Sequence, residues 1–321
     1  MRVPRTPCLA VPAILLLLTA CSPRPPSPTS QTATVRQLPT FSPAPSQLPS
    51  LTPIVTASPT PVLCDPAAIN FCISDGTFLL QRPIQPPGND MVDRGYAYGS
   101  TEQGTRQPHH GVDLYNATGV PVLAAAAGTV FYAGNDLSLR FGPQLDFYGN
   151  LIVLAHSLPG RTLYTLYGHL SKLDVTTGMS VQAGEKIGEV GSTGIAIGSH
   201  LHFEVRLYPQ DYNSTLDPEL WLNPELGTGV LAIRLVNHAG VFQSTPLDIQ
   251  YYPDPNGAFT QSWQPEIYPP EMDQGNNWEN ALLADLLPGS YRITILWQGA
   301  WLSRWVTLET GKLTQTEFIL P

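Results

Sequence analysis

The chain has 321 residues, of which 42% are hydrophobic and only 13% are charged. This length allows two modest domains with buried cores, and the 33 prolines indicate that a polar, uncharged segment lies outside the folded part. Acidic residues outnumber basic ones by 25 to 16, for a formal net charge of -9. Such a balance excludes the basic surface that nucleic-acid binding requires, so we expect no nucleic-acid partner.

The first twenty residues have the features of a secretory signal. Two arginines precede the apolar residues 9–18, a stretch too short to anchor stably across a membrane. It ends in Leu-Thr-Ala-Cys, which resembles a bacterial lipobox, and this resemblance implies a diacylglyceryl group on Cys21 and cleavage in front of it. Two acyl chains suffice for stable anchoring. We therefore expect residues 1–20 to be a lipoprotein signal peptide of an exported protein, anchored to the cell membrane and facing the cell wall. The alternative is an ordinary secretory signal with Cys21 incidental.

Residues 21–62 contain mostly Pro, Ser and Thr and have almost no charge, so they predict a disordered linker. At about 3 Å per residue this linker would reach up to about 100 Å from the membrane. Cys64 and Cys72 follow where order is expected to begin. In an exported protein they could form a small disulfide loop. Since no cysteine lies in a CxxC pair, a thiolate zinc site is not expected.

A short motif, HHGVD, begins at His109. Valines, tyrosines and glycines alternate throughout this region, which predicts short strands joined by tight turns. In a strand, alternate residues share a face, so His109, Gly111 and Asp113 would point the same way. Gly111 leaves room between an imidazole and a carboxylate, which suits a metal ion.

A second motif, HLHFEV, begins at His200 and places His200, His202 and Glu204 on one strand face. A further histidine, His169, stands in LYGHLS. One histidine in a strand is more often a structural hydrogen bonder than a ligand, and one HxH pair leaves both interpretations open. Five His and Asp positions in three short segments, out of 7 histidines in the chain, favour zinc. Catalytic zinc takes three protein ligands, imidazoles and carboxylates among them, and keeps one position open.

The order HxGxD, GTV, LYGHLS, VGSTG and HLHFEVR resembles the lysostaphin-type, LytM-like family of zinc metallopeptidases over about residues 78–225. The resemblance implies one zinc ion per chain, with His109, Asp113 and His202 as its ligands. It also implies that His169 and His200 are catalytic and flank a zinc-activated water. Because the chain has no HExxH motif, these two histidines would carry the proton transfer.

These features predict a zinc-dependent endopeptidase that hydrolyses peptide stems or cross-bridges of cell-wall peptidoglycan. The alternative is a non-catalytic or latent relative that acts as an activator or scaffold of another cell-wall hydrolase, although no expected ligand is missing. A binding lipoprotein with structural histidines would bind no stoichiometric zinc. Residues 78–94 or the C-terminal part could cover the cleft, with Asn89 or Asp90 as a temporary fourth ligand.

Three further positions near the motifs have two interpretations each. Glu204 could support His202 or form a surface salt bridge with Arg206. Tyr96 and Tyr98 could line a substrate groove or serve as ordinary strand aromatics.

The pattern of residues changes after WLNP. In residues 227–321, apolar and polar residues alternate in short segments, which predicts strands. The stretch DLLPGSYRITI resembles prealbumin-like β-sandwiches. The expected fold class is therefore mainly β, with a lysostaphin-type peptidase β-sheet domain at 63–226 followed by a small β-sandwich domain at 227–321. Five tryptophans of the second part could stack on sugar rings, but core or edge packing is favoured: Trp263, Trp278, Trp297, Trp301 and Trp305.

Overall fold

The computed structural model describes residues 64–158, 160–272 and 275–321, which belong to one compact unit. The expected signal peptide (1–20), the lipidated Cys21 and the linker (21–62) lie outside these residues. No helix in the described ranges is both long and apolar enough to cross a bilayer. The helices that are described are single 3₁₀ turns: η1 Tyr212–Ser214, η2 Pro218–Leu220 and η3 Pro270–Met272. The expected mainly β fold is confirmed.

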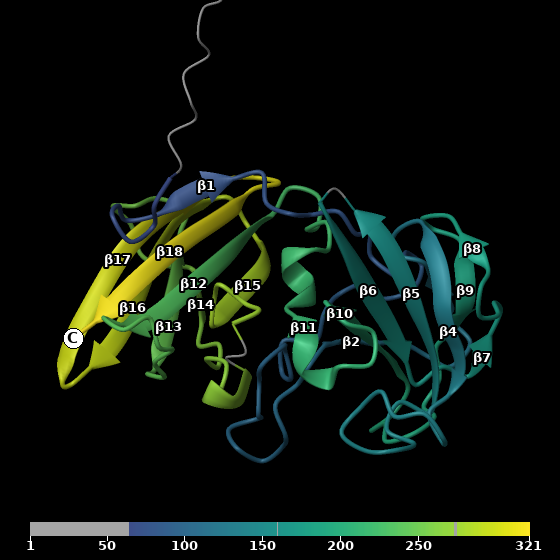
Figure 1. Cartoon of the computed structure of the whole chain (residues 1–321). Coiled ribbons are helices and arrows are strands. Elements are labelled where there is room, and N and C mark those ends of the chain that lie inside the picture. Colours follow the sequence, from purple (N-terminus) through teal and green to yellow (C-terminus); the bar gives the residue numbers. More distant parts are fainter. Residues whose placement is uncertain (1–63, 159, 273–274) are drawn as a thin grey trace, which may run out of the picture. The chain divides into compact units, whose positions relative to one another are not determined.

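The site is built on an antiparallel sheet with the strand order β11-β10-β6-β5-β4-β8, in which β2 also pairs with β10 (Figure 1). Its strands are β2 Val112–Tyr115, β4 Gly128–Asn135, β5 Asn150–Leu158, β6 Arg161–Gly168, β8 Ser180–Val181, β10 His200–Arg206 and β11 Thr215–Leu216. A small neighbouring sheet has the order β3-β9-β7, from β3 Pro121–Leu123, β7 Lys172–Leu173 and β9 Lys186–Glu189.

Strand β10 explains how the sheet holds polar groups without losing its core. All seven of its residues are buried, and apolar and polar side chains alternate along it. Leu201, Phe203 and Val205 belong to the main hydrophobic cluster, as the alternation predicts. The opposite face carries the polar residues His200, His202, Glu204 and Arg206. Period-two alternation in a fully buried strand thus separates a packing face from a chemical face.

Two further four-stranded sheets are formed by the rest of the chain (Figure 1). One has the order β1-β18-β12-β15, from β1 Cys72–Ser74, β12 Gly229–Asn237, β15 Ala281–Leu286 and β18 Leu313–Leu320. The other has the order β14-β13-β16-β17, from β13 Leu247–Tyr252, β14 Gln261–Trp263, β16 Gly289–Trp297 and β17 Ala300–Leu308. Side chains from both sheets share one hydrophobic cluster, as in a β-sandwich. A likeness to prealbumin-like domains stays a prediction.

Two segments connect the parts that the sequence assigns to separate domains. Strand β1, which carries Cys72 of a Cys64–Cys72 disulfide, pairs with β18 near the C-terminus. Tyr268 and Met272 pack into the same hydrophobic cluster as the strands of the peptidase part. Contacts therefore cross the expected boundary at 226/227 in both directions: β1 pairs with a strand of the C-terminal part, and Tyr268 and Met272 pack into the peptidase part. The boundary remains a proposal.

The five tryptophans of the C-terminal part have different environments. Trp263 and Trp297 pack against the shared cluster of the two sheets, and Trp278 packs against a smaller one. Trp301 and Trp305 on β17 are exposed. Packing is thus the role of the first three.

Candidate active site

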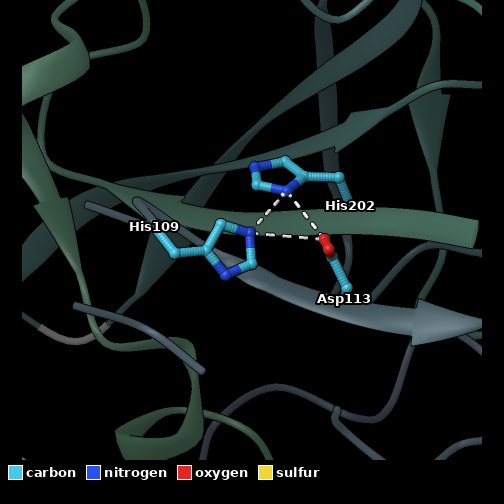
Figure 2. A group of neighbouring side chains, drawn as sticks. All are labelled: His109, Asp113 and His202. Atoms are coloured by element: carbon cyan, nitrogen blue, oxygen red, sulfur yellow. Dashed lines mark hydrogen bonds and ion pairs between the residues drawn. The ribbon is translucent and has the colours of Figure 1, made fainter. Parts of the chain in front are cut away.

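The pairing of β2 with β10 brings three expected metal ligands together (Figure 2). Asp113 lies directly opposite His202 in the register, and His109 lies just before β2. His202 Nδ1 is 2.9 Å from Asp113 Oδ1 and 3.1 Å from His109 Nε2, and His109 Nε2 is 3.3 Å from Asp113 Oδ1. All three side chains are buried. Among the described residues, they are the one group of His, Cys, Asp and Glu side chains whose ligand atoms lie close enough together to hold a metal ion.

The hydrogen bonds of the two imidazoles point one nitrogen of each ring toward this cluster. His109 Nδ1 is 2.6 Å from the carbonyl oxygen of Tyr96, and His202 Nε2 is 2.9 Å from Glu204 Oε1. The carbonyl oxygen of Tyr96 only accepts, so His109 Nδ1 carries the proton and His109 Nε2 keeps its lone pair. His202 lies between two carboxylates, Glu204 at Nε2 and Asp113 at Nδ1. Burial alone would lower the pKa of His202, but these carboxylates raise it to about 9, and a metal ion at Nδ1 would replace the proton there. His109 Nε2, His202 Nδ1 and Asp113 Oδ1 face one another.

This donor set fits zinc. Two imidazoles and one carboxylate are ordinary zinc ligands, and tetrahedral bonds of about 2.0–2.1 Å separate ligand atoms by about 3.3 Å. The separations between the three donor atoms are 2.9–3.3 Å. Gly111 is required here, because a Cβ at this position would lie 2.8 Å from the ring of His202 and 2.6 Å from the carbonyl oxygen of Phe203. The space that the sequence predicts at Gly111 is therefore filled by the His202 ring.

The structure also brings the two expected catalytic histidines to the cluster. The ring centroids of His169 and His200 are 4.8 Å apart, and His169 lies 5.7 Å from His202. His169 Nδ1 donates to the carbonyl oxygen of Thr193 at 2.8 Å, and His200 Nδ1 donates to that of Gly198 at 3.1 Å. Each ring thus keeps Nε2 as an acceptor.

Burial makes both of these histidines neutral. It lowers the pKa of His169 to about 3, and it also lowers the pKa of His200. His169 has a left-handed backbone conformation, with φ of 62°, which is uncommon for a residue other than glycine. Such conformations cost about 1–3 kcal/mol and concentrate at functional sites. Both imidazoles are therefore neutral beside the candidate metal cluster, with Nε2 free to accept a hydrogen bond from water.

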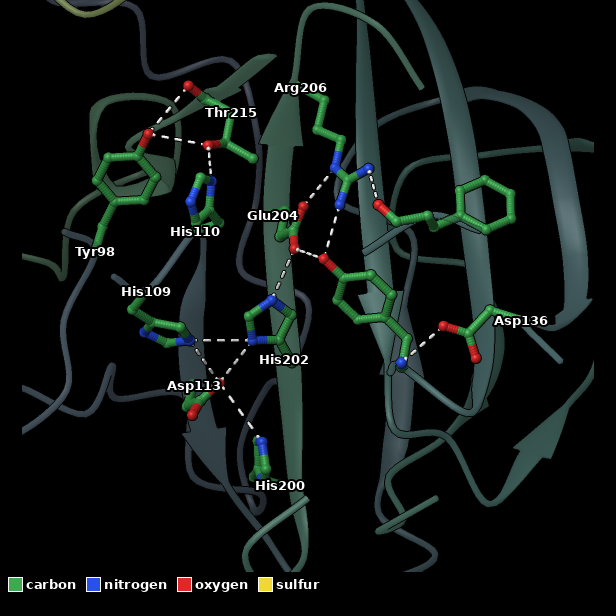
Figure 3. Close-up of polar contacts among 12 residues, drawn as sticks. Tyr98, His109, His110, Asp113, Asp136, His200, His202, Glu204, Arg206 and Thr215 are labelled. Atoms are coloured by element: carbon green, nitrogen blue, oxygen red, sulfur yellow. Dashed lines mark hydrogen bonds and ion pairs between the residues drawn. The ribbon is translucent and has the colours of Figure 1, made fainter. Parts of the chain in front are cut away.

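Glu204 supports His202 from the same face of β10 (Figure 3). Its other contacts are a hydrogen bond from Tyr148 and an ion pair with Arg206. Glu204 and Arg206 are both fully buried, so the expected surface salt bridge is wrong: the pair forms inside the protein and one of its members contacts a candidate ligand. Burial alone would raise the pKa of Glu204, but Arg206 and His202 hold it below its ordinary value.

A cleft of about 190 Å³ lies over the cluster. Tyr96 and Arg106 line it near His109, and Tyr115, Ile195 and Ile197 line it elsewhere. The sequence did not indicate Arg106 or the buried Tyr148, because neither stands in a motif; each is identified only by its contacts.

Residues near the cleft resolve several open expectations. Tyr96 lines it and stacks on His109, with ring centroids 4.2 Å apart, whereas Tyr98 is buried and bonds Thr215. Asn89 bonds to Tyr115 and Asn116, and neither Asn89 nor Asp90 lines the cleft, so a temporary fourth ligand from this segment stays a prediction. No residue of 78–94 lines the cleft.

The part of the chain that holds this site is similar to known proteins. The model for peptidase family M23 matches residues 107–218, a range that contains all five His and Asp residues of the candidate site. The uncharacterized lipoprotein YgeR of Escherichia coli is 40% identical over 116 residues, which are 36% of this chain and 39% of that protein. The peptidoglycan DD-endopeptidase ShyA of Vibrio cholerae is 37% identical over 98 residues, 30% of this chain and 20% of that one.

Among solved structures, the catalytic domain of the antimicrobial peptidase lysostaphin from Staphylococcus simulans is 34% identical and covers 40% of this chain and 89% of that chain, with a TM-score of 0.34. The chain spans between 18% and 39% of the length of the curated relatives it matches. The chain carries a lysostaphin-type, LytM-like domain, which matches the model for peptidase family M23 over residues 107–218.

Proposed function

We propose that this protein is a zinc-dependent endopeptidase that hydrolyses peptide stems or cross-bridges of peptidoglycan. One observation carries the proposal: a complete set of three donor atoms faces the same cleft as two neutral histidines. The match of residues 107–218 to peptidase family M23 supports a peptidase, and ShyA, one of the relatives, is named a peptidoglycan DD-endopeptidase. A scaffold that no longer cleaves its substrate would have no need to keep this set complete.

In this proposal His109, Asp113 and His202 hold one zinc ion. Bound zinc supplies a Lewis acid that polarises a peptide carbonyl and makes water a stronger nucleophile. The protein adds rigidity, because Tyr96 and Glu204 fix the orientation and protonation of the two ligand imidazoles. Burial of the cluster also keeps bulk water from weakening its electrostatic interactions.

His169 and His200 are the groups proposed to move protons. Both are neutral, and both have Nδ1 occupied by a backbone carbonyl, so Nε2 is the atom that can take a proton from the attacking water. The resulting imidazolium can then give a proton to the leaving amine. Positioned acid–base groups of this kind typically contribute about 10²–10⁴ in rate.

We also propose that Cys21 is lipidated and that the protein is exported and held at the membrane facing the wall. Two relatives carry the word lipoprotein in their names, which supports this arrangement. The anchor would place the peptidase part within reach of peptidoglycan through the linker at 21–62.

The test compares the purified full chain with His109→Ala, His169→Ala and, as a matched control, His238→Ala, which removes an exposed histidine outside the site. Zinc content and the release of peptides or new amino groups from purified peptidoglycan are measured. We expect one zinc per chain, no zinc and no activity in His109→Ala, and zinc without activity in His169→Ala. Zinc binding without cleavage by the unmodified chain would support an activator role instead, and absence of zinc would refute the site.

A further inference from the structure

A segment outside the matched range of family M23 contacts the loop that leads to the metal cluster. Glu266 of this segment accepts four hydrogen bonds from that loop: from Thr101 N at 2.9 Å, Thr101 Oγ1 at 2.9 Å, Gln103 N at 2.8 Å and Ser100 Oγ at 3.2 Å. Both carboxylate oxygens take part. Burial alone would raise the pKa of Glu266, but the N–H groups of Thr101 and Gln103 hold it below its ordinary value. The contact is therefore made by an ionised carboxylate.

The loop that Glu266 holds is joined directly to the backbone of His109. His109 N donates to the carbonyl oxygen of Ser100 at 3.0 Å, and Gly99 N donates to the carbonyl oxygen of His109 at 2.8 Å. One residue, Ser100, thus bonds Glu266 with its side chain and His109 with its backbone. A shift of the loop at Ser100 would shift His109 with it.

The other end of the loop acts on the ring of His109. Arg106 N donates to the carbonyl oxygen of Thr101, and the Arg106 guanidinium lies over the ring of Tyr96 at 4.8 Å. Tyr96 in turn stacks on His109, and its carbonyl oxygen accepts a hydrogen bond from His109 Nδ1. The loop therefore contacts both the backbone of His109 and the residue that packs on its ring.

Close packing beside Glu266 fixes the base of the loop. Tyr268 lies against Gly99, where a Cβ would come within 2.3 Å of the tyrosine ring. Gly99 also has a φ of +77°, which favours glycine. Tyr268 is buried; its hydroxyl donates to Asp217 of the peptidase part, and its backbone N donates to the carbonyl oxygen of Asn280. The loop is thus closely packed at Gly99, beside a cavity of about 250 Å³ that Glu266 lines.

From these contacts we infer that Glu266 is a positioning residue for the candidate metal site. Glu266 holds residues 99–107 so that His109 Nε2 faces Asp113 and His202. This inference rests on the proposed function, since it takes His109 as a zinc ligand. It makes a segment of the C-terminal part a component of the peptidase site. The rival explanation is that Glu266 only stabilises the packing between the two parts.

A matched control separates the two explanations. Asp285 is another carboxylate of the C-terminal part that bonds the preceding part, through Arg82 at 2.7 Å and Glu225 N at 2.7 Å. It is not among the residues that line the cleft or form the metal group. A purely structural role predicts the same outcome for Glu266→Ala and Asp285→Ala.

The experiment uses the full chain and measures zinc affinity by competition with a chromophoric chelator, together with thermal unfolding and hydrogen exchange of the Thr101 and Gln103 amides. We expect Glu266→Ala to weaken zinc binding by about tenfold, the lower end of the effect of removing groups that orient metal ligands. Exchange at Thr101 and Gln103 should accelerate. The zinc affinity of Glu266→Gln, which keeps one acceptor oxygen, should lie between those of the unmodified chain and Glu266→Ala. Asp285→Ala should lower the unfolding temperature and leave the zinc affinity unchanged.

Two outcomes would overturn the inference: a folded Glu266→Ala with the zinc affinity of the unmodified chain, or equal loss of zinc in the Glu266 and Asp285 variants in proportion to their unfolded fractions. If Glu266→Ala does not fold, the comparison rests on Glu266→Gln. Failure of the proposed function is recognised separately, because the unmodified chain would then bind no zinc or cleave no peptidoglycan.

Discussion

Glu204 Oε1 lies 2.9 Å from His202 Nε2, two residues along the same face of β10. The carboxylate is fully buried and also binds Arg206, so a single side chain connects a candidate zinc ligand to an ion pair in the interior. The strand geometry makes this possible because residues two apart in a strand share a face.

Glu204→Gln is expected to weaken zinc binding and stability together. Zinc affinity should fall about 10–100-fold, because the group that orients His202 is weakened. The free energy of unfolding should fall by about 3–5 kcal/mol, because the buried Arg206 loses its carboxylate. Chelator competition and urea unfolding measure the two effects. The control is Glu317→Gln, whose partner Arg234 is partly exposed and should lose less. Unchanged zinc affinity in Glu204→Gln would refute the role assigned here.

Arg106→Gln is expected to impair substrate binding selectively. Apart from histidines, Arg106 is the one basic side chain among the described residues that line the cleft, and peptide substrates with a free carboxylate would bind there. The KM for such a peptide should rise by about tenfold, which corresponds to the lower range for a hydrogen bond to a charged group.

Steady-state kinetics with a matched pair of peptides, one with a carboxylate and one with the amide, check this expectation. The amide peptide should lose little, and Arg140→Gln, which removes an exposed arginine that does not line the cleft, should have little effect on either. An equal loss for both peptides would assign Arg106 to stacking on Tyr96 instead.

The free energy of unfolding is expected to fall as the pH rises, because of the buried side chain of Glu279. The side chain is buried, its Oε1 has no hydrogen-bond partner among the described residues, and burial raises its pKa to about 8. A carboxyl with a raised folded-state pKa stabilises the fold fully below its unfolded pKa, near 4.5, and this contribution is lost as pH rises through 8.

The free energy of unfolding should therefore fall by on the order of a few kcal/mol between pH 5 and pH 9, and the fall should be smaller in Glu279→Gln. Denaturant unfolding across that range is the measurement, with the exposed Glu309→Gln as control. Some slope should remain, because burial also raises the pKa of Asp217 and Glu219. Identical slopes for the unmodified chain and Glu279→Gln would contradict the expectation.

Chelation of zinc is expected to destabilise the fold around His109. Zinc at a hundred times its Kd should raise the free energy of unfolding by about 2.7 kcal/mol relative to the chelated protein. Thermal unfolding with zinc and with excess chelator tests this. The same difference should vanish in His109→Ala, and a chelator effect that persists in that variant would place the stabilising metal elsewhere.

The sequence by itself determined the candidate residues and the chemical face of β10. Local alternation in HLHFEV puts His200 and His202 on one strand face, and the resemblance of the motifs to the LytM-like family implied that His109, Asp113 and His202 are the ligands. His109 itself lies before β2, so alternation did not place it. Only the tertiary structure decided which long-range partners these residues meet. The register of β2 with β10 sets the donor distances, Tyr148 and Arg206 enclose Glu204, and Glu266 reaches a loop more than 160 residues earlier. The physical reason is that a side-chain direction is set by the local backbone, whereas a contact between distant segments depends on how the whole chain packs.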